Sequence, residues 1–277
     1  VVCVDGAGAA LLSEPSGDGR VFAVQIEIAT KGTLRTQAEQ GKTTELPVES
    51  TGAFVFRERR LPSAGRDARA LQAVREYETA RMDATIQGGA TDVEIPSSQQ
   101  LIVPTGRSEG VLNYTFRTLL TREQVDLLEM PCDPLTLVAL LPSENVEAGS
   151  TWKVPEWAGQ MLAGIEAVSK VDLTGKVDSL TETDAKLRIS GTVSGLKAGA
   201  ATTLTIAGVL EFDVANRHLR GGTVRVEVAA DIGTVAPGIL ACVTGRLSRR
   251  PATAAGSLND ALVEGIPLDP SARALVL

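Results

Sequence analysis

The sequence predicts a β-dominated α+β fold, in which a large curved antiparallel sheet carries two or three short helices on one face. The main observation is a series of alternating apolar and polar runs from Asp184 to Arg250, separated by glycine-marked breaks and free of any helical pattern. A period of two places every second side chain on one face of a strand, so these runs predict an antiparallel meander. Aromatic residues make up only 3% of the chain, so aliphatic and β-branched side chains must fill the core, as is typical of sheets.

The first half of the chain contains further alternating segments. Residues 22–28 alternate strictly and predict the first strand, and Lys31-Gly32 is predicted to form a turn after it. Shorter strands are expected at 43–48, 53–61, 100–103 and 111–119.

Helices are expected in a few places only. The segment 66–82 has Leu71, Val74 and Tyr77 at a spacing of three among Arg and Glu residues, which predicts a helix. Thr121 and Gln124 have the spacing of a capping box and predict a second helix, which Pro131 ends.

Two more segments have helical features. Residues 155–165 begin with a proline suited to a first helical turn. The apolar run 135–141 fits either a helix or a strand, because a short run without polar residues shows no period.

The domain organisation predicted from these patterns has three parts. Residues 1–20 are interpreted as a signal-peptide remnant and leader, 21–250 as a single β-rich domain, and 251–277 as a linker-like tail that is loosely docked or truncated. Apolar residues followed by Ala7-x-Ala9 are typical of the end of a secretory signal, although an arbitrary disordered start is the alternative. The signal interpretation places the protein in the periplasm, in the cell envelope or outside the cell.

The charge pattern excludes one class of partner. The formal net charge is −7, whereas nucleic-acid binding needs a clustered basic surface. The one basic cluster, Arg246, Arg249 and Arg250, is expected to be the solvated end of the last strand. No apolar run is long enough for a transmembrane span.

Two cysteines lie within the predicted domain. Cys132 and Cys242 are a candidate disulfide in an oxidising compartment. The alternative is that both are buried thiols that act as small apolar side chains.

Groups able to carry out chemistry are scarce. His218 is the single histidine, and it is interpreted as a turn residue between two strands. Asp126, Glu129 and Asp133 cluster around Cys132, which fits a carboxylate or thiolate metal site or a nucleophilic cysteine. More simply, Asp126 and Glu129 form the wet face of a short helix. Glycine-rich strings match no phosphate-binding loop, and no metal-ligand spacing is found, so no cofactor is predicted.

The two tryptophans are candidate binding residues. Trp152 and Trp157 lie five residues apart on either side of Pro155. They either line a ligand pocket or anchor this segment to the core, because a tryptophan buries a large apolar area.

The order of several short motifs resembles the DUF6263-type family of secreted bacterial proteins. The matching residues are Leu141-Pro142, Val146-x-x-Gly149-Ser150-x-Trp152 and Gly208-x-x-x-Phe212-Asp213. Ser150 replaces the usual acidic residue of that family. The resemblance implies an envelope location and a β-rich fold, and it implies no functional residue.

These observations lead to a hypothesis about function. A curved sheet of this kind also resembles the half-barrels of bacterial lipoprotein carriers. We therefore expect a non-catalytic envelope or secreted protein that binds an apolar ligand such as a lipid, or another envelope protein, on its curved sheet. The alternatives are a carboxylate-based envelope enzyme and a purely structural or interaction module.

Overall fold

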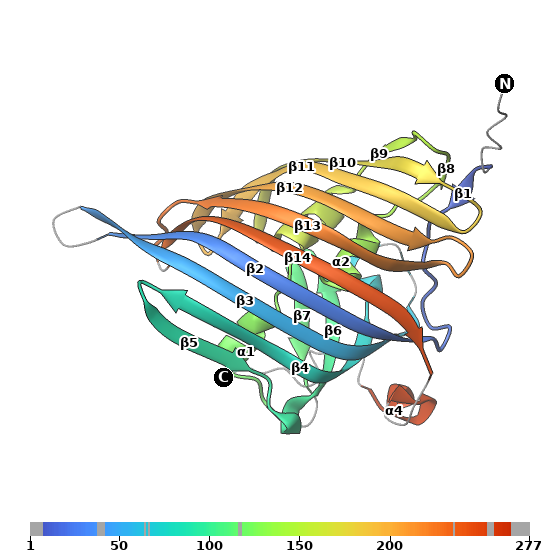
Figure 1. Ribbon diagram of the computed structural model, residues 1–277, viewed down its shortest axis with the longest axis horizontal. Helices are drawn as coiled ribbons and strands as arrows, with labels where there is room; N and C mark the ends of the chain where they lie inside the picture. The colour runs from blue at the N-terminus through green and yellow to red at the C-terminus, as the bar shows by residue number, and fades with distance from the viewer. Residues whose placement is uncertain are drawn as a thin grey trace.

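The computed structural model confirms the predicted fold class (Figure 1). It describes residues 8–37, 42–63, 65, 67–115, 118–234, 236–253 and 258–266. The strands are β1 (Ala10–Leu11), β2 (Val21–Gln37), β3 (Thr43–Arg60), β4 (Ala73–Ile86), β5 (Gly89–Glu94), β6 (Leu101–Arg107), β7 (Gly110–Tyr114), β8 (Asn145–Val146), β9 (Thr151–Lys153), β10 (Ala167–Leu180), β11 (Asp184–Lys197), β12 (Ala200–Asp213), β13 (His218–Ala230) and β14 (Gly238–Ala252).

The described residues form one twelve-stranded antiparallel sheet and a small separate pair, β1 with β8. The order across the large sheet is β7-β6-β4-β3-β2-β14-β13-β12-β11-β10-β9, and β5 pairs with β4. Strands β10 to β14 follow one another in sequence and in space, which confirms the meander predicted for the second half of the chain. Strand β14 then pairs with β2 along its whole length, so the two halves of the chain share one sheet.

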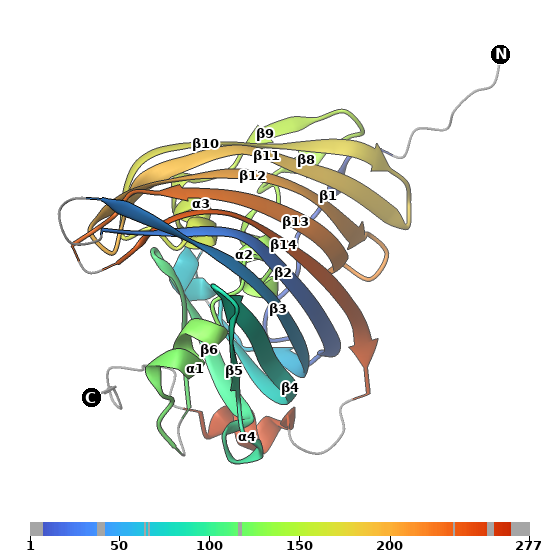
Figure 2. The same ribbon diagram turned by 60° about the vertical axis from the view of Figure 1, so that its left-hand side comes forward.

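The sheet is an open arch, and other segments of the chain fill much of its concave side (Figure 2). The helices are α1 (Arg122–Leu127), α2 (Pro134–Ala139), α3 (Glu156–Ala163) and α4 (Asp260–Glu264), with 3-10 turns η2 (Ala68–Ala70) and η3 (Ser97–Gln99). Helices α2 and α3 lie beneath the arch and contact each other and β7, and α3 also contacts β10 and β11. We call α2, α3, the segment 128–133 and the β6–β7 hairpin at one edge of the sheet the inner layer, and the other strands of the large sheet the arch.

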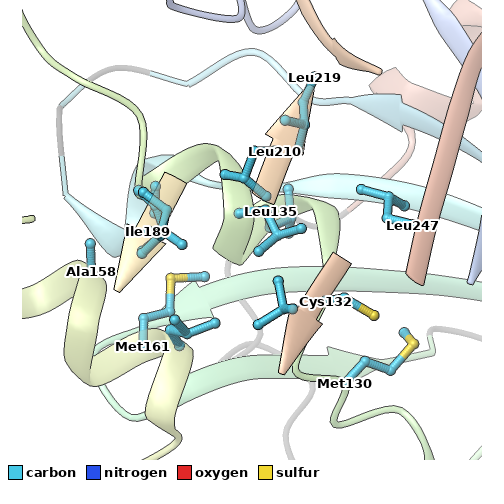
Figure 3. Packing of buried hydrophobic residues seen from close by; sticks show 14 of the residues in the cluster. Met130, Cys132, Leu135, Ala158, Met161, Ile189, Leu210, Leu219 and Leu247 are labelled. Carbon is cyan, nitrogen blue, oxygen red and sulfur yellow. The ribbon is translucent and has the colours of Figure 1, made fainter. Parts of the chain in front are cut away.

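The core lies between the arch and the inner layer. Inward-facing aliphatic residues of the long strands alternate with exposed polar ones, as a period of two requires. Figure 3 shows Leu135 and Met161 of the inner layer facing Ile189 and Leu210 of the sheet, and all four side chains are buried. Apolar burial of this extent is the main stabilising contribution to the fold.

Local sequence signals explain the short helices. The capping box at Thr121 and Gln124 is present, with each side chain bonded to the other residue's backbone N–H. The run 135–141 contains helix α2, in which Pro134 occupies the first turn and Asp133 accepts a hydrogen bond from the backbone N–H of Leu135. The helix is buried on almost every side, and a helix that is apolar all round has no amphipathic period to detect.

The helix predicted for 66–82 is wrong, because most of this segment belongs to strand β4. A register shift opposite Val55 and Phe56 marks a bulge in β4. As a result, the next buried residue after Tyr77 is Ala80, three positions along the chain. The bulge adds one residue to the alternation and gives Tyr77 and Ala80 a helical spacing. The spacing of Leu71, Val74 and Tyr77 has another cause, because both faces of this segment are buried, Leu71 and Tyr77 in the main core and Val74 opposite them. Val74 is buried on the other face, in a second small apolar cluster.

Two strand boundaries also differ from the prediction. Lys31-Gly32 does not form a turn, because β2 continues to Gln37, and Gly32 pairs with Ala241 of β14. A Cβ at Gly32 would collide with the carbonyl oxygen of Leu240, so glycine here permits a close approach between strands. The segments predicted at 43–48 and 53–61 are joined in the single strand β3, which ends at Arg60.

The segments before and after the predicted domain pack against it. Leu12, in the expected leader, is fully buried in the main core. Leu258 and Ile266, in the expected tail, are buried with Leu61 in the second apolar cluster. The predicted signal-peptide remnant at 1–7 lies outside the described residues. Among the helices of the described part, none has the length and apolar character needed to cross a membrane.

Candidate functional site

A cavity of about 250 Å³ lies between the concave face of the arch and the inner layer. The sheet contributes mainly aliphatic side chains from its central strands, and the inner layer contributes α2, α3, the β6–β7 hairpin and the segment before α2. Its apolar lining residues are Ile28, Met82, Val111, Met130, Pro131, Met161, Leu162, Ala163, Leu204, Val226, Val228 and Val243.

All three methionines of the chain line this cavity. Met82 comes from β4, Met130 from the segment before α2, and Met161 from α3. They are far apart in sequence, and only the fold brings them together. Methionine is unbranched and polarisable, so it adapts to apolar partners of different shape.

Charged groups lie at the rim of the cavity. Lys197, at the end of β11, forms a 3.7 Å ion pair with Glu129 of the inner layer, and both side chains are about half exposed. Glu109, in the β6–β7 turn, lies on the same rim. An exposed pair of this length contributes little to stability, but it links the sheet to the inner layer across the cavity.

The buried part of the lining contains two polar residues, Asp133 and Thr136. Both Asp133 oxygens accept hydrogen bonds from Arg75, each at 2.7 Å. The hydroxyl of Thr136, by contrast, has no hydrogen-bond partner among the described residues. A buried hydroxyl is usually bonded, so this unpaired one lowers the stability of α2 packing rather than adding an accessible polar group to the cavity.

The predicted acidic cluster does not converge on a common point. The Asp126 and Glu129 side chains are mostly exposed and pair with Arg122 and Lys197, respectively. Asp133 is buried and neutralised by Arg75. Among the described residues, no group of three or more His, Cys, Asp or Glu side chains is placed to hold a metal ion.

Asp133 belongs to a chain of buried charges that the sequence did not reveal. Arg75 also donates a 2.9 Å bond to Glu58, and Arg249 bonds to both Glu58 and Glu14 at 3.1 and 2.6 Å. The members alternate in sign in the order Asp133, Arg75, Glu58, Arg249, Glu14 and Arg60. We call these six residues the buried charge chain; it links the inner layer and the N-terminal segment to the sheet.

The state of these charges follows from their neighbours. Burial by itself would raise the pKa of Glu58, but the positive charges of Arg75 and Arg249 outweigh it, and the pKa is lowered. Arg249 also stacks on Phe22, with its guanidinium carbon 3.8 Å from the ring centroid. The prediction of a solvated basic end is therefore wrong for Arg249, which is buried, although Arg246 and Arg250 are exposed.

The predicted disulfide does not form, and Cys132 and Cys242 are both free thiols. Cys132 lies under the inner face of β14, where a Cβ at Gly245 would come within 2.5 Å of its sulfur. Cys242 has the opposite parity to the inward-facing Gly245 and Val243, so the sheet separates the two cysteines. Burial raises the pKa of the Cys132 thiol to about 12, which leaves it protonated at neutral pH.

The tryptophans anchor the inner layer rather than line the cavity. The indole N–H of Trp152 donates a 2.9 Å bond to the carbonyl of Leu140, and its ring covers Gly175 of β10. Trp157, on α3, packs against the main core. These contacts match the anchoring alternative drawn from the sequence.

His218 is adjacent to a turn, as predicted, but it is the first residue of β13 and is buried. Its ring lies 5.1 Å from that of Phe22, and neither ring nitrogen has a hydrogen-bond partner among the residues described. Burial lowers its pKa, so the ring is neutral at neutral pH.

Comparisons with known proteins leave the family open. No protein-family model and no curated protein matches the chain. Among solved structures, it is similar to DynF from the dynemicin biosynthesis pathway of Micromonospora chersina, with 8% identity over 88% of this chain and 86% of that chain and a TM-score of 0.19. It is also similar to OmpF of Salmonella typhi in complex with daunomycin, with 6% identity, 86% and 100% coverage, and a TM-score of 0.17. TM-scores this low establish no shared fold.

Proposed function

We propose that this protein is a non-catalytic binder of a small apolar molecule, which it holds in the cavity between the arch and the inner layer. The observation that carries the proposal is the lining: aliphatic residues from the sheet, together with every methionine of the chain. Ligand sites are generally concave and mostly apolar, with a few polar groups that orient the ligand. The cavity beneath the arch has this composition.

The volume of the cavity limits the size of the ligand. An apolar cavity of roughly 150 Å³ accommodates benzene, so a volume of about 250 Å³ suits a molecule with on the order of ten carbon atoms. A short chain or a substituted ring meets this limit, whereas a two-chain lipid does not. The proposal therefore narrows the expectation of lipid binding to small apolar compounds.

The methionines provide a direct test. With ¹³C-methyl methionine labelling, the Met82, Met130 and Met161 signals report on the cavity from three sides. We expect titration with butylbenzene, which has ten carbon atoms, to shift the three signals saturably.

A pair of variants on β14 supplies the control. Val243 faces the cavity, and Val243→Phe should weaken binding at least tenfold by filling it. Its neighbour Thr244 points to the outer face, so Thr244→Phe should leave the affinity unchanged. If no small apolar compound shifts the signals, or if both variants weaken binding equally, the proposal is wrong.

A further inference from the structure

The cavity opens toward one end of the arch, where β2 and β3 extend past the inner layer (Figure 1). Inward-facing residues become more exposed toward this end. In β2, Ile28 is buried, whereas Thr30 and Leu34 are half-buried. In β4, Met82 is half-buried and Ile86 is 37% exposed. Since Ile28, Thr30 and Met82 line the cavity, its wall leads out to the ends of these strands.

Five aliphatic residues form an apolar surface at this open end. Ile239 of β14, Leu34 of β2 and Leu46 of β3 are direct cross-strand neighbours. Val48 of β3 lies opposite Ile86 of β4. All five side chains face the concave side and are partly exposed, and within the described part of the chain none packs against either apolar cluster. We call these five residues the shelf.

The shelf is continuous with the wall of the cavity. In β14, Ala241 lies on the same face between Ile239 of the shelf and Val243 of the cavity. In β4, Ala84 lies in the same way between the shelf and Met82. From Ile239 to Val243 a strand advances roughly 13 Å. The shelf therefore extends the apolar surface of the cavity along the strands without an intervening charged residue.

We infer that the ligand is a single straight hydrocarbon chain of more than about ten carbon atoms, whose first part fills the cavity and whose remainder lies along the shelf. This inference rests on the proposed function and adds the chemical class of the ligand. Contiguous exposed apolar residues commonly mark a binding surface, and their continuity with the cavity lining assigns them to the same ligand. Because the shelf carries no charged residue, a polar end group would lie beyond it in solvent.

The test measures affinity as a function of chain length. Alkyl maltosides with chains of 8, 10, 12 and 14 carbons are titrated below their micelle concentrations, and the methionine methyl shifts of the full chain report binding. A buried methylene group raises affinity about fourfold, which we expect while the cavity fills. On the shelf one side of the chain stays in water, so each carbon beyond ten should add about twofold, or more than tenfold from 10 to 14 carbons.

Two leucine variants assign the effect to the shelf. Leu34→Ser should reduce the affinity for the 14-carbon chain at least threefold and leave that for the 8-carbon chain unchanged, which also shows that the variant is folded. Leu240 is the matched control, because it is 44% exposed and has the opposite parity to its neighbour Ile239. Leu240→Ser should leave both affinities unchanged.

The outcomes separate this inference from the proposed function. If butylbenzene binds but the maltosides do not, if affinity stops rising beyond ten carbons, or if the two leucine variants behave alike, the single-chain assignment is overturned while the binding function stands. A lower molecular mass of ligand-free Leu34→Ser in light scattering would assign the shelf to contacts between copies of the chain and would also overturn it. If neither butylbenzene nor any maltoside shifts the methionine signals, the proposed function itself fails.

Discussion

Replacing Arg75 by methionine tests whether the buried charge chain holds the inner layer against the sheet. Arg75 is fully buried on β4 and makes two bonds to Asp133, at the start of α2, and one to Glu58 of β3. Methionine fills much of the same volume but carries no charge. Asp133 would then lose its ion-pair partner and Glu58 one of its two hydrogen-bonded arginines.

The expected cost follows from this geometry. Opposite charges about 3 Å apart interact with a gross energy of roughly 5 kcal/mol at an effective dielectric constant of about 20. Removing one partner of a buried pair costs about 3–5 kcal/mol, because the other charge remains buried and uncompensated. Since domains are stable by roughly 5–15 kcal/mol, Arg75→Met should remove a large part of the free energy of unfolding.

Urea unfolding followed by circular dichroism measures this loss. We expect the midpoint to fall by about 1 M or more. Combining the change with Asp133→Asn removes the uncompensated carboxylate, so the double variant should be more stable than Arg75→Met alone. The control is Arg225→Met, which breaks an exposed pair with Glu227 and should leave the midpoint unchanged.

Two results would refute this reasoning. A loss below about 1 kcal/mol, the range of an exposed pair, would mean that the charge chain is solvated. Additive effects of Arg75→Met and Asp133→Asn would mean that the two side chains do not interact, because coupled neighbours deviate from additivity.

Three further predictions concern single buried residues. Burial lowers the pKa of His218 from its ordinary value of 6.5. The neutral ring therefore stabilises the fold fully above pH 6.5, and the free energy of unfolding falls below that pH by at most about 1.4 kcal/mol per pH unit. His218→Phe should flatten the pH dependence of the unfolding free energy below pH 6.5, and an unchanged slope would contradict this prediction. Gly245→Ala places a methyl group 2.5 Å from the Cys132 sulfur and should cost about 1–3 kcal/mol in urea unfolding; adding Cys132→Ala should recover part of this loss, and no recovery would show that the two groups do not touch. With a pKa near 12, the Cys132 thiol should resist iodoacetamide in the folded protein and react after unfolding without reductant, as measured by peptide mass spectrometry. A disulfide-linked peptide containing Cys132 and Cys242 would show that the two thiols are not free.

The sequence predicted most of the sheet, for a physical reason. In β11 to β14, one face of the sheet is buried and the other is exposed, so apolar and polar residues alternate along each strand and the strands can be recognised from the sequence. Thr121 and Pro155 marked two helix starts in the same local manner. At the start of β4 both faces are buried, and a bulge follows Tyr77, so the alternation is lost and the same reasoning predicted a helix that does not exist.

The candidate site could not be predicted from local sequence patterns, because its lining residues come from segments far apart in the sequence. Met82, Met130 and Met161 share no spacing, and only the folding of the inner layer beneath the arch places them on one cavity. Trp152, which the sequence singled out, packs on Gly175 instead. The chain has only three methionines, but their number does not show that they meet in one cavity.

By itself, the sequence determined the fold class, the meander and the scarcity of groups suited to catalysis, because these depend on composition and on neighbours along the chain. The tertiary structure decided which charged residues are buried and where a cavity remains between the elements. Arg249 looks like a surface residue in sequence, yet pairing with Glu14 and Glu58 makes its burial tolerable. The cavity and the unpaired hydroxyl of Thr136 depend on how β-strands and helices far apart in sequence fail to fill the space between them.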